Sequence, residues 1–198
     1  MKRYVIPLLV LVVAAASAVV VFTATTASAR RGEEEACGTE RWAFKTLSDR
    51  QRNFVNLHPR PTTVAKINAL QPPTRFSGRR TPYERQVWRV TAQITRYKIE
   101  HDRDIHLILL DHGANMIAEM PARICLPRRT RDRRALILVR RMFESRCGPV
   151  PHSWHDLGAV VEISGVGFWD VPHNQPGHAL NNAELHPVTG LRIISGCS

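Results

Sequence analysis

Aromatic side chains make up only 7% of this 198-residue chain. A domain dedicated to single-stranded nucleic acid stacks successive bases on such rings, so the composition argues against that class. The sequence also has no G-x-S-x-G segment, no C-x-x-C pair, no internal repeat and no small-molecule cofactor motif. A serine-hydrolase nucleophile elbow and the common zinc-finger spacings are therefore not indicated.

Acidic residues are scarce, because 17 Asp and Glu stand against 28 Lys and Arg, which gives a net charge of +11. The chain begins with Lys2 and Arg3, an apolar run over residues 4–22, and a small-residue stretch that ends at Ala29. This pattern predicts a signal peptide over residues 1–29, cleaved after Ala29, and a secreted or periplasmic protein. The alternative is an uncleaved N-terminal helix that anchors the chain in a membrane.

The chain after the predicted leader stays basic. Loss of Lys2 and Arg3, and of no acidic residue, lowers the net charge from +11 to +9. Such a charge favours a polyanionic partner such as nucleic acid or a cell-wall polymer. The same charge also keeps a secreted protein soluble without any partner.

Four cysteines follow the predicted leader: Cys37, Cys125, Cys147 and Cys197. An even number in an oxidising compartment predicts two disulfides, and three pairings are open. We favour Cys125 with Cys147, which closes the middle segment, and Cys37 with Cys197, which ties the two ends.

Residues 30–85 predict an extension that packs on a core domain, because the segment is too small for a core of its own. A capping-box spacing predicts a helix over residues 48–57. A second short helix, capped by Thr62 or Thr63, is expected to run through Leu70.

Residues 86–198 predict a β-rich core domain, because β-branched and aromatic residues recur there with a period of two. The expected strands span residues 86–99, 105–110, 116–120, 160–166 and 184–194. A helix is expected over residues 128–146, between the third and fourth strands. This order predicts a mainly β fold of the α+β class, a five-stranded OB-like barrel. An open, helix-topped sheet is the alternative.

Two polar stretches far apart in the sequence are expected to meet, because in an OB barrel the loops after the first and fourth strands flank the ligand face. The first stretch carries Asp102, Asp104 and His106. The second carries Asp170, His173, Gln175, Asn181, Glu184 and His186. Glu119 adds an acid to an otherwise apolar strand, where a buried carboxylate needs a partner.

Three interpretations of these residues stay open. In the first, they bind a divalent cation, for which carboxylates favour calcium or magnesium and imidazoles favour zinc or manganese. In the second, they transfer protons in a hydrolytic reaction. In the third, they only satisfy backbone groups in turns and in a long loop. The candidate catalytic residues are Asp102, Asp104, His106, Glu119, His173 and Glu184.

The expected helix is unusually rich in arginine. Basic side chains on one helix can contact phosphates or an anionic surface. The alternative is a solvated outer face. The candidate binding residues are Arg128, Arg129, Arg131, Arg133 and Arg134, together with Asp170, His173, Gln175, Asn181 and His186 of the polar loop.

Residues spread over most of the chain after the leader carry a family resemblance. The segments are Cys37–Trp42 with Lys45, Thr46 and Asp49; Tyr97, Lys98 and Glu100 with Asp102, Asp104, His106 and Leu107; Met116–Glu119 with Pro121 and Cys125; and Gly165–Phe168 with Asp170, His173, Gln175, Gly177, Asn181 and Glu184–Pro187. This set resembles an uncharacterised family of secreted bacterial proteins. The resemblance implies no activity.

A second likeness rests on a shorter segment. Residues 102–107 at a strand start, with Glu119 and Pro121 after the third strand, are similar to the thermonuclease family. Those enzymes place a D-G-D hairpin and a D-T-P-E segment on an OB barrel and use calcium. Arg103 replaces the glycine, and the D-T-P-E order is absent.

We therefore expect a secreted, disulfide-stabilised OB-like domain that binds a polyanion or a cell-envelope partner through the two loops. The first alternative is a metal-dependent phosphodiesterase or nuclease. The second is a structural envelope protein without a catalytic site.

Overall fold

The computed structural model describes residues 37–197, in which six β-strands form one mixed sheet. The strands are β1 (Asn56–Pro61), β2 (Gln86–Ile99), β3 (Ile105–Asp111), β4 (Ala114–Met120), β5 (His155–Trp169) and β6 (Ala183–Ser195). The α-helices are α2 (Trp42–Lys45), α3 (Val64–Asn68) and α4 (Arg133–Cys147). Short 3-10 turns are η1 (Arg52–Phe54), η2 (Tyr83–Arg85) and η3 (Arg123–Cys125).

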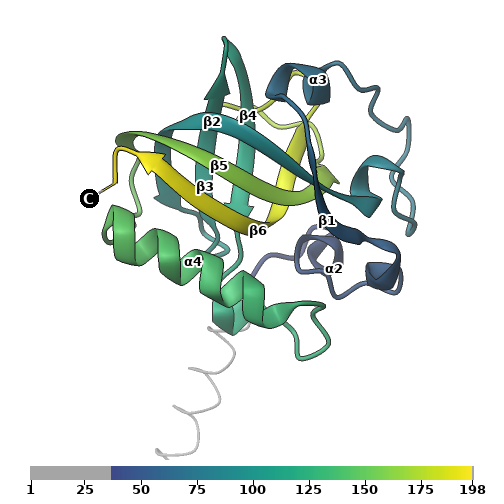
Figure 1. The fold of residues 1–198 in the computed structure, drawn as a ribbon. Helices are drawn as coiled ribbons and strands as arrows, with labels where there is room; N and C mark the ends of the chain where they lie inside the picture. The colour runs from purple at the N-terminus through teal and green to yellow at the C-terminus, as the bar shows by residue number, and fades with distance from the viewer. Residues whose placement is uncertain (1–36, 198) are drawn as a thin grey trace, which may run out of the picture. The chain divides into compact units, whose positions relative to one another are not determined.

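Five of the strands close into a ring in the order β2-β3-β4-β6-β5, because β5 pairs with β2 as well as with β6 (Figure 1). The pairs in the ring are antiparallel except β4 with β6, which run parallel. In the sequence, the main helix α4 lies between β4 and β5, which are the third and fourth of the five ring strands in chain order. This barrel-like sheet has the strand order and helix position that the sequence predicts, and so it resembles an OB barrel.

Period-two alternation positions the core. In β3, Ile105, Leu107 and Leu109 are fully buried and belong to the main apolar cluster. His106, on the opposite side of the same strand, is also fully buried, since successive side chains of a strand point to opposite faces. The strand therefore separates the apolar core from a second, polar interior.

Helix α4 packs on the barrel through Leu136, Val139 and Phe143, which recur at helical spacing and are buried. It begins at Arg133 and not at residue 128, as we had predicted, because Asp132 has a left-handed φ of 54° that interrupts a helix. Arg131 also holds the preceding turn away from the helix, since its backbone N–H donates to the Leu47 carbonyl.

The N-terminal segment differs from the prediction in one helix. Instead of a helix over residues 48–57, the structure has the short turn η1 and then β1, which pairs in parallel with β2. The Ser48 hydroxyl contacts Thr46 Oγ1 at 2.9 Å, and so it does not cap a helix. The second short helix is confirmed as α3, because Thr63 Oγ1 accepts from the Lys66 backbone N–H.

The predicted disulfide pairing is wrong. The structure joins Cys37 to Cys125 and Cys147 to Cys197. Cys125 precedes α4 and Cys147 ends it, and a helix of 15 residues holds its ends about 22 Å apart at ~1.5 Å per residue. Residues 126–132 and this helix separate Cys125 from Cys147 in the sequence, and Cys125 bonds Cys37 instead.

Two disulfides and no free cysteine among the described residues are typical of an oxidising compartment outside the cytoplasm. None of the helices within residues 37–197 is long and apolar enough to cross a membrane. The predicted leader, residues 1–29, lies outside the described residues.

Candidate functional site

The two polar stretches singled out in the sequence meet in the polar interior beneath β3. We call this group the acid–histidine cluster. It consists of Lys45, Glu100, Asp102, Asp104, His106, Glu119, Asp170, His173, Glu184 and His186, connected by the contacts described below.

Strand register brings these residues together. His106 on β3 lies directly opposite Glu119 on β4. On the other side of β4, Ile117 pairs with Glu184 of β6. Residues two apart on a strand share a face, so Glu119 lies on the face of Ile117, and His186 on the face of Glu184. Three strands of the barrel thus direct polar side chains into one space.

The inner half of the cluster alternates carboxylates with imidazoles. His106 Nδ1 lies 3.2 Å from Glu100 Oε1 and 2.9 Å from Glu119 Oε1. The other Glu119 oxygen lies 2.8 Å from His186 Nδ1. The second nitrogen of that ring, Nε2, lies 3.1 Å from Asp104 Oδ2. Both histidine side chains are fully buried.

The outer half leads from this interior toward the surface. His173 Nε2 lies 2.7 Å from Asp170 Oδ2 and 3.6 Å from Glu184 Oε1. Lys45 Nζ lies 3.9 Å from the other Asp170 oxygen. The His173 side chain keeps 21% of its surface exposed, so the outer half opens to solvent.

Several buried atoms of the cluster have close neighbours but no hydrogen bond. Asp104 Oδ2 and His186 Nε2 lie 3.1 Å apart, and His186 Nδ1 lies 2.8 Å from Glu119 Oε2, but these pairs are not aligned as hydrogen bonds. Asp170 Oδ1 and Glu184 Oε2 are likewise buried without a hydrogen bond. Buried polar groups are normally hydrogen-bonded, and leaving one unpaired costs about 1–3 kcal/mol. Carboxylate oxygens that converge with imperfect hydrogen bonds form an arrangement that a cation would satisfy, provided that the histidine ligands lose their protons when it binds.

The charges of the inner half depend on one another. Burial alone lowers the pKa of His186, but the charge of Glu119 and the contact with Asp104 outweigh it and raise the pKa to about 9. Burial also opposes ionisation of Glu119, yet the charge of His186 and the contact with His106 hold its pKa well below the usual range. Without a cation, protonated histidines therefore balance Glu119.

Other carboxylates of the cluster are less well balanced. Burial raises the pKa of Asp104 to about 6, in spite of the nearby His186. Burial also raises the pKa of Glu184, and the charges of Glu119 and Asp170 add to this effect. Six carboxylates face Lys45, Lys98 and three histidines, so the carboxylates outnumber the basic groups and the cluster favours a positive ligand.

Two groups of three residues have the spacing of metal ligands. In each group, one ligand atom per residue lies within 4.8 Å of the others. Metal–ligand bonds to oxygen and nitrogen measure ~2.0–2.6 Å, so ligands of one ion lie up to about 5 Å apart. The groups are Asp104–Glu119–His186 and Asp170–His173–Glu184.

Two predicted site residues serve the loop itself. Asn181 Nδ2 donates to the carbonyls of Ile67 and Leu70, and Asn181 Oδ1 accepts from the Ala183 N–H. The Gln175 backbone contacts His173 Nδ1 and His178 Nδ1. These interactions fix the segment that carries Asp170 and His173.

Lys45 and Glu100 are the two cluster residues that were not among the site candidates, and Lys45 is the less expected of them. It lies on the four-residue helix α2 and is buried. Its Nζ lies 5.3 Å from the centre of the Phe168 ring and faces Asp170. The pKa of Lys45 is raised, because the charges of Glu119, Asp170 and Glu184 outweigh its burial. An isolated lysine in a short segment offers no signal in the sequence.

Most of the arginines predicted to bind a polyanion form hydrogen bonds within the protein. Arg129 donates to the Ser48 carbonyl, Arg131 to those of Arg52 and Val55, and Arg133 to those of Leu126 and Arg123. Arg128 and Arg134 are exposed. Three of the five predicted contacts with a polyanion are thus engaged in backbone hydrogen bonds.

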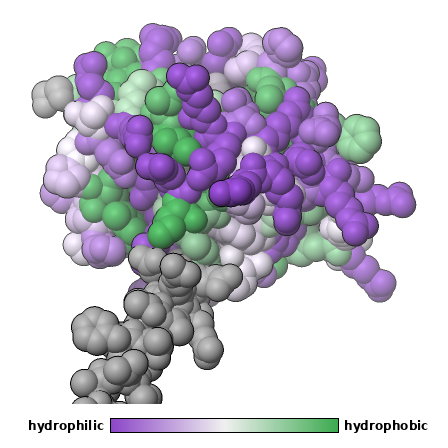
Figure 2. Space-filling model, turned by 90° about the horizontal axis from the view of Figure 1, so that it is seen from below, coloured by the Kyte–Doolittle hydropathy of each residue, from purple (hydrophilic) through white to green (hydrophobic). Residues whose placement is uncertain are grey.

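A basic groove of about 620 Å³ runs between η3 and α4. Helix α4 lies at the lower side in Figure 1, and Figure 2 shows that side with hydrophilic side chains over much of it. The groove contains no residue of the acid–histidine cluster, so the positive and negative features of the protein are separate. The groove is lined by Ala122, Arg123, Ile124, Arg133, Ile137, Arg140, Arg141 and Glu144.

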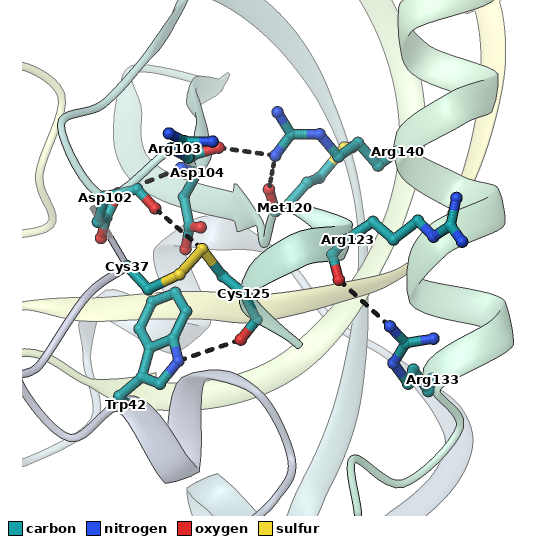
Figure 3. Close-up of a disulfide and its surroundings, with 10 residues drawn as sticks. All are labelled: Cys37, Trp42, Asp102, Arg103, Asp104, Met120, Arg123, Cys125, Arg133 and Arg140. Atoms are coloured by element: carbon teal, nitrogen blue, oxygen red, sulfur yellow. Dashed lines mark hydrogen bonds between the residues drawn. A yellow bond between two sulfur atoms is a disulfide. The ribbon is translucent and has the colours of Figure 1, made fainter. Parts of the chain in front are cut away.

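The disulfide Cys37–Cys125 lies beside the cluster (Figure 3). Cys125 Sγ is 4.0 Å from the Asp102 carbonyl oxygen, and Trp42 Nε1 donates to the Cys125 carbonyl at 3.3 Å. In the same view, Arg140 Nη1 donates to the carbonyls of Arg103 and Met120 at 2.9 and 2.7 Å. These carbonyls belong to the neighbours in sequence of Asp104 and Glu119, so α4 supports the inner half of the cluster.

No family model matches the chain, and no curated protein is similar to it. Two solved structures with distant similarity are an aspartyl-tRNA synthetase from Leishmania major Friedlin and an asparaginyl-tRNA synthetase from Entamoeba histolytica in complex with asparaginyl-adenylate. The first is 8% identical over 87% of this chain and 26% of that chain, with a TM-score of 0.42. The second is 12% identical over 72% of this chain and 25% of that chain, with a TM-score of 0.40. The chain thus spans about a quarter of these two structures. Membership of the family of secreted bacterial proteins or of the thermonuclease family stays a prediction.

Proposed function

We propose that this protein is an OB-type binding domain of an oxidising compartment, and that its functional centre is a divalent cation bound in the acid–histidine cluster. The observation that carries this proposal is the inner group of Asp104, Glu119 and His186. These three side chains are buried, their ligand atoms lie within 4.8 Å of one another, and the 3.1 Å contact between Asp104 Oδ2 and His186 Nε2 is not aligned as a hydrogen bond.

The donor set narrows the choice of cation. Two carboxylates with one imidazole combine hard oxygen with borderline nitrogen, which favours zinc or manganese over calcium and magnesium. The surrounding contacts support such a site, since His106 holds one oxygen of Glu119 and is itself held by Glu100. Residues that orient a ligand in this way contribute strongly to metal affinity.

Isothermal titration calorimetry of the chelator-treated protein tests the proposal. We expect binding of zinc or manganese, and loss of at least tenfold in affinity in Glu119→Gln, because removing one carboxylate removes a ligand and a charge. The matched control is Glu162→Gln, whose carboxylate lies outside the cluster and contacts Arg89 and Arg192. Equal affinity in Glu119→Gln and the wild type would contradict the proposal.

We further propose that the partner is a polyanion or an anionic cell-envelope polymer, held by the basic groove and the free arginines near it. Within the described chain, Arg123 and Arg141 line the groove and donate no side-chain hydrogen bond. The loops of the cluster are unsuited to this contact when no cation is present, because their carboxylates repel anions. Binding should therefore weaken steeply with salt.

Retention on heparin measures this contact. We expect Arg128→Ala, Arg134→Ala and Arg141→Ala to elute at lower salt than the wild type, each with a shallower salt dependence of affinity. Arg89→Ala, on β2, is the control and should elute unchanged. Failure of the wild type to bind at any salt concentration would remove the polyanion from the proposal.

A metal-dependent phosphodiesterase is the second candidate. The observation that favours it is the partial exposure of His173, which gives a phosphodiester access to the outer half of the cluster. A bound cation would polarise the phosphoryl group for attack by water, which breaks a P–O ester bond and releases an alcohol. Plasmid DNA incubated with manganese, zinc, magnesium or calcium tests this candidate, and Glu119→Gln should abolish any cleavage.

A further inference from the structure

The two groups of potential ligands in the cluster are adjacent and unequal. The inner group, Asp104–Glu119–His186, is buried throughout, whereas the outer group, Asp170–His173–Glu184, contains the partly exposed His173. The inner ligands come from strands β4 and β6 and from Asp104, which immediately precedes β3. The outer group takes two ligands from the loop after β5. The cluster thus offers one rigid and one looser position.

Glu184 lies between these positions. Its Oε1 is 3.6 Å from His173 Nε2 in the outer group, and its Oε2 is 4.0 Å from His186 Nδ1 in the inner group. Oε2 has no hydrogen-bond partner, although only 3% of the side chain is exposed. A carboxylate whose two oxygens face two different groups of ligands has the placement of a bridge.

Charge also favours more than one ion. Asp104, Glu119, Asp170 and Glu184 carry four negative charges in the two groups. Glu100 and Asp102 add two more, while Lys98 contacts Glu100, His106 contacts Glu100 and Glu119, and Lys45 faces Asp170. With His173 and His186 neutral as ligands, six carboxylates face the positive charges of Lys45, Lys98 and His106, so one divalent cation would leave one negative charge unpaired in the protein interior, which is costly. A second divalent cation would offset that charge and leave a small positive charge for an anionic ligand.

We propose that the acid–histidine cluster is a two-metal centre in which Glu184 bridges an inner and an outer divalent cation. The inference rests on the proposed function and adds the second ion, its ligands and the bridge. Paired ions at bridged sites lie ~3.5–4 Å apart and together bind one phosphoryl or carboxyl group. The ligand class that follows is a phosphate or carboxylate group, which reaches the outer ion beside His173.

Manganese titration of the chelator-treated full-length protein tests the two-metal centre. Bound metal is counted by equilibrium dialysis with mass spectrometry, and electron paramagnetic resonance reports whether the two ions are magnetically coupled. We expect two equivalents of manganese and a coupled signal in the wild type. His173→Ala should bind one equivalent with an uncoupled signal, because it removes an outer ligand that is partly exposed.

Two further variants give controls. Glu184→Gln keeps the shape of the side chain but removes its charge, and it should lose coupling and weaken the second equivalent at least tenfold. Glu162→Gln should bind two coupled equivalents, as the wild type does. Thermal unfolding followed by circular dichroism establishes that each variant is folded before its metal content is compared.

The outcomes separate the two proposals. Absence of bound manganese and zinc in the folded wild type would contradict the proposed function itself. A single equivalent that persists in His173→Ala would leave the proposed function standing and overturn the two-metal centre. Two equivalents that both persist in His173→Ala and Glu184→Gln would overturn it as well, because the second ion would then lie elsewhere.

Discussion

At the scale of single residues, the buried carboxylates of the cluster lower the stability of the metal-free fold. The Asp104 side chain is fully buried 3.1 Å from His186 Nε2, and burial outweighs that contact and raises the pKa of its carboxyl from 3.8 to about 6. A carboxylate with a raised pKa destabilises the folded state at neutral pH, because its charged form is less favourable there than in the unfolded chain. A cation bound to the Asp104 carboxylate would stabilise its charge and offset this loss of stability.

Asp104→Asn should therefore separate stability from binding. In the absence of metal at pH 7, we expect the free energy of unfolding to rise by about 1–3 kcal/mol, because the amide removes the buried charge. Metal-induced stabilisation should be lost in the same variant. Urea denaturation with and without zinc measures both effects, and a metal-free variant less stable than the wild type would contradict this account of Asp104.

His106 predicts a pH dependence of the metal-free protein. Burial lowers its pKa, but Glu100 and Glu119 raise it from 6.5 to about 9. Its other neighbour is Trp154, whose ring centre lies 5.1 Å away and is itself approached by Arg96 and Lys98. The raised pKa stabilises the fold fully below pH 6.5, and this stabilisation is lost as the pH rises through about 9.

The difference between the wild type and His106→Gln isolates this contribution. With chelator present, we expect the wild type to exceed the variant by on the order of 3 kcal/mol near pH 6, and by much less near pH 10. Urea denaturation across this range measures the difference. A constant gap between the two proteins would show that the charge of His106 does not contribute.

At the scale of elements, α4 supports the cluster through one side chain. Arg140 Nη1 donates to the carbonyls of Arg103 and Met120, and its Nε donates to Glu144. Since these carbonyls adjoin Asp104 and Glu119, Arg140 is a positioning residue for two proposed ligands.

Arg140→Met should weaken metal binding without touching a ligand. We expect a fivefold to fiftyfold loss of zinc or manganese affinity, in the range seen when supporting groups around a metal site are removed. Arg141→Met is the matched control on the exposed side of the same helix. Arg140→Lys restores a donor and should recover part of the affinity, which a purely steric role of Arg140 would not predict.

The elements of the barrel were predictable because their patterns are local. Period-two alternation identified all five strands of the ring, and shared faces grouped Asp104 with His106 and Glu184 with His186 before the fold was known. β1 escaped prediction because it contains Pro59 and Pro61 and is held by parallel pairing with β2, which leaves no periodic signal. Lys45 escaped because only the tertiary fold brings it to Asp170.

At the scale of the whole molecule, the two disulfides stabilise different parts of the fold. Cys37–Cys125 spans 88 residues and Cys147–Cys197 spans 50. Each closes a long loop and stabilises the fold by roughly 4–5 kcal/mol in the chain-entropy description. The first lies beside Asp102 and the cluster, and the second ties the end of α4 to the C-terminus.

Removing the disulfides one at a time should show this division. Cys37→Ser with Cys125→Ser should lower the melting temperature by roughly 8–16 °C and also weaken metal binding. Cys147→Ser with Cys197→Ser should lower the melting temperature similarly while leaving the metal affinity of the folded protein unchanged. Equal effects of the two pairs on metal affinity would contradict the assigned roles.

The buried carboxylates and the exposed arginines lie in different parts of the molecule, which the composition of the sequence could not predict. The net charge of +11 predicted a polyanion at the two loops. The loops instead meet at buried carboxylates, and the free arginines line α4 and η3. Composition reports only the sum of charges, whereas their placement depends on long-range strand pairing.

Anomalous diffraction from crystals grown with manganese or zinc tests the central claim most directly. The account predicts an anomalous peak ~2.0–2.6 Å from ligand atoms of Asp104, Glu119 and His186. A crystal with saturating metal, no peak in the cluster, and His186 hydrogen-bonded to Asp104 and Glu119 would contradict the account. The acid–histidine cluster would then be a self-neutralising part of the core.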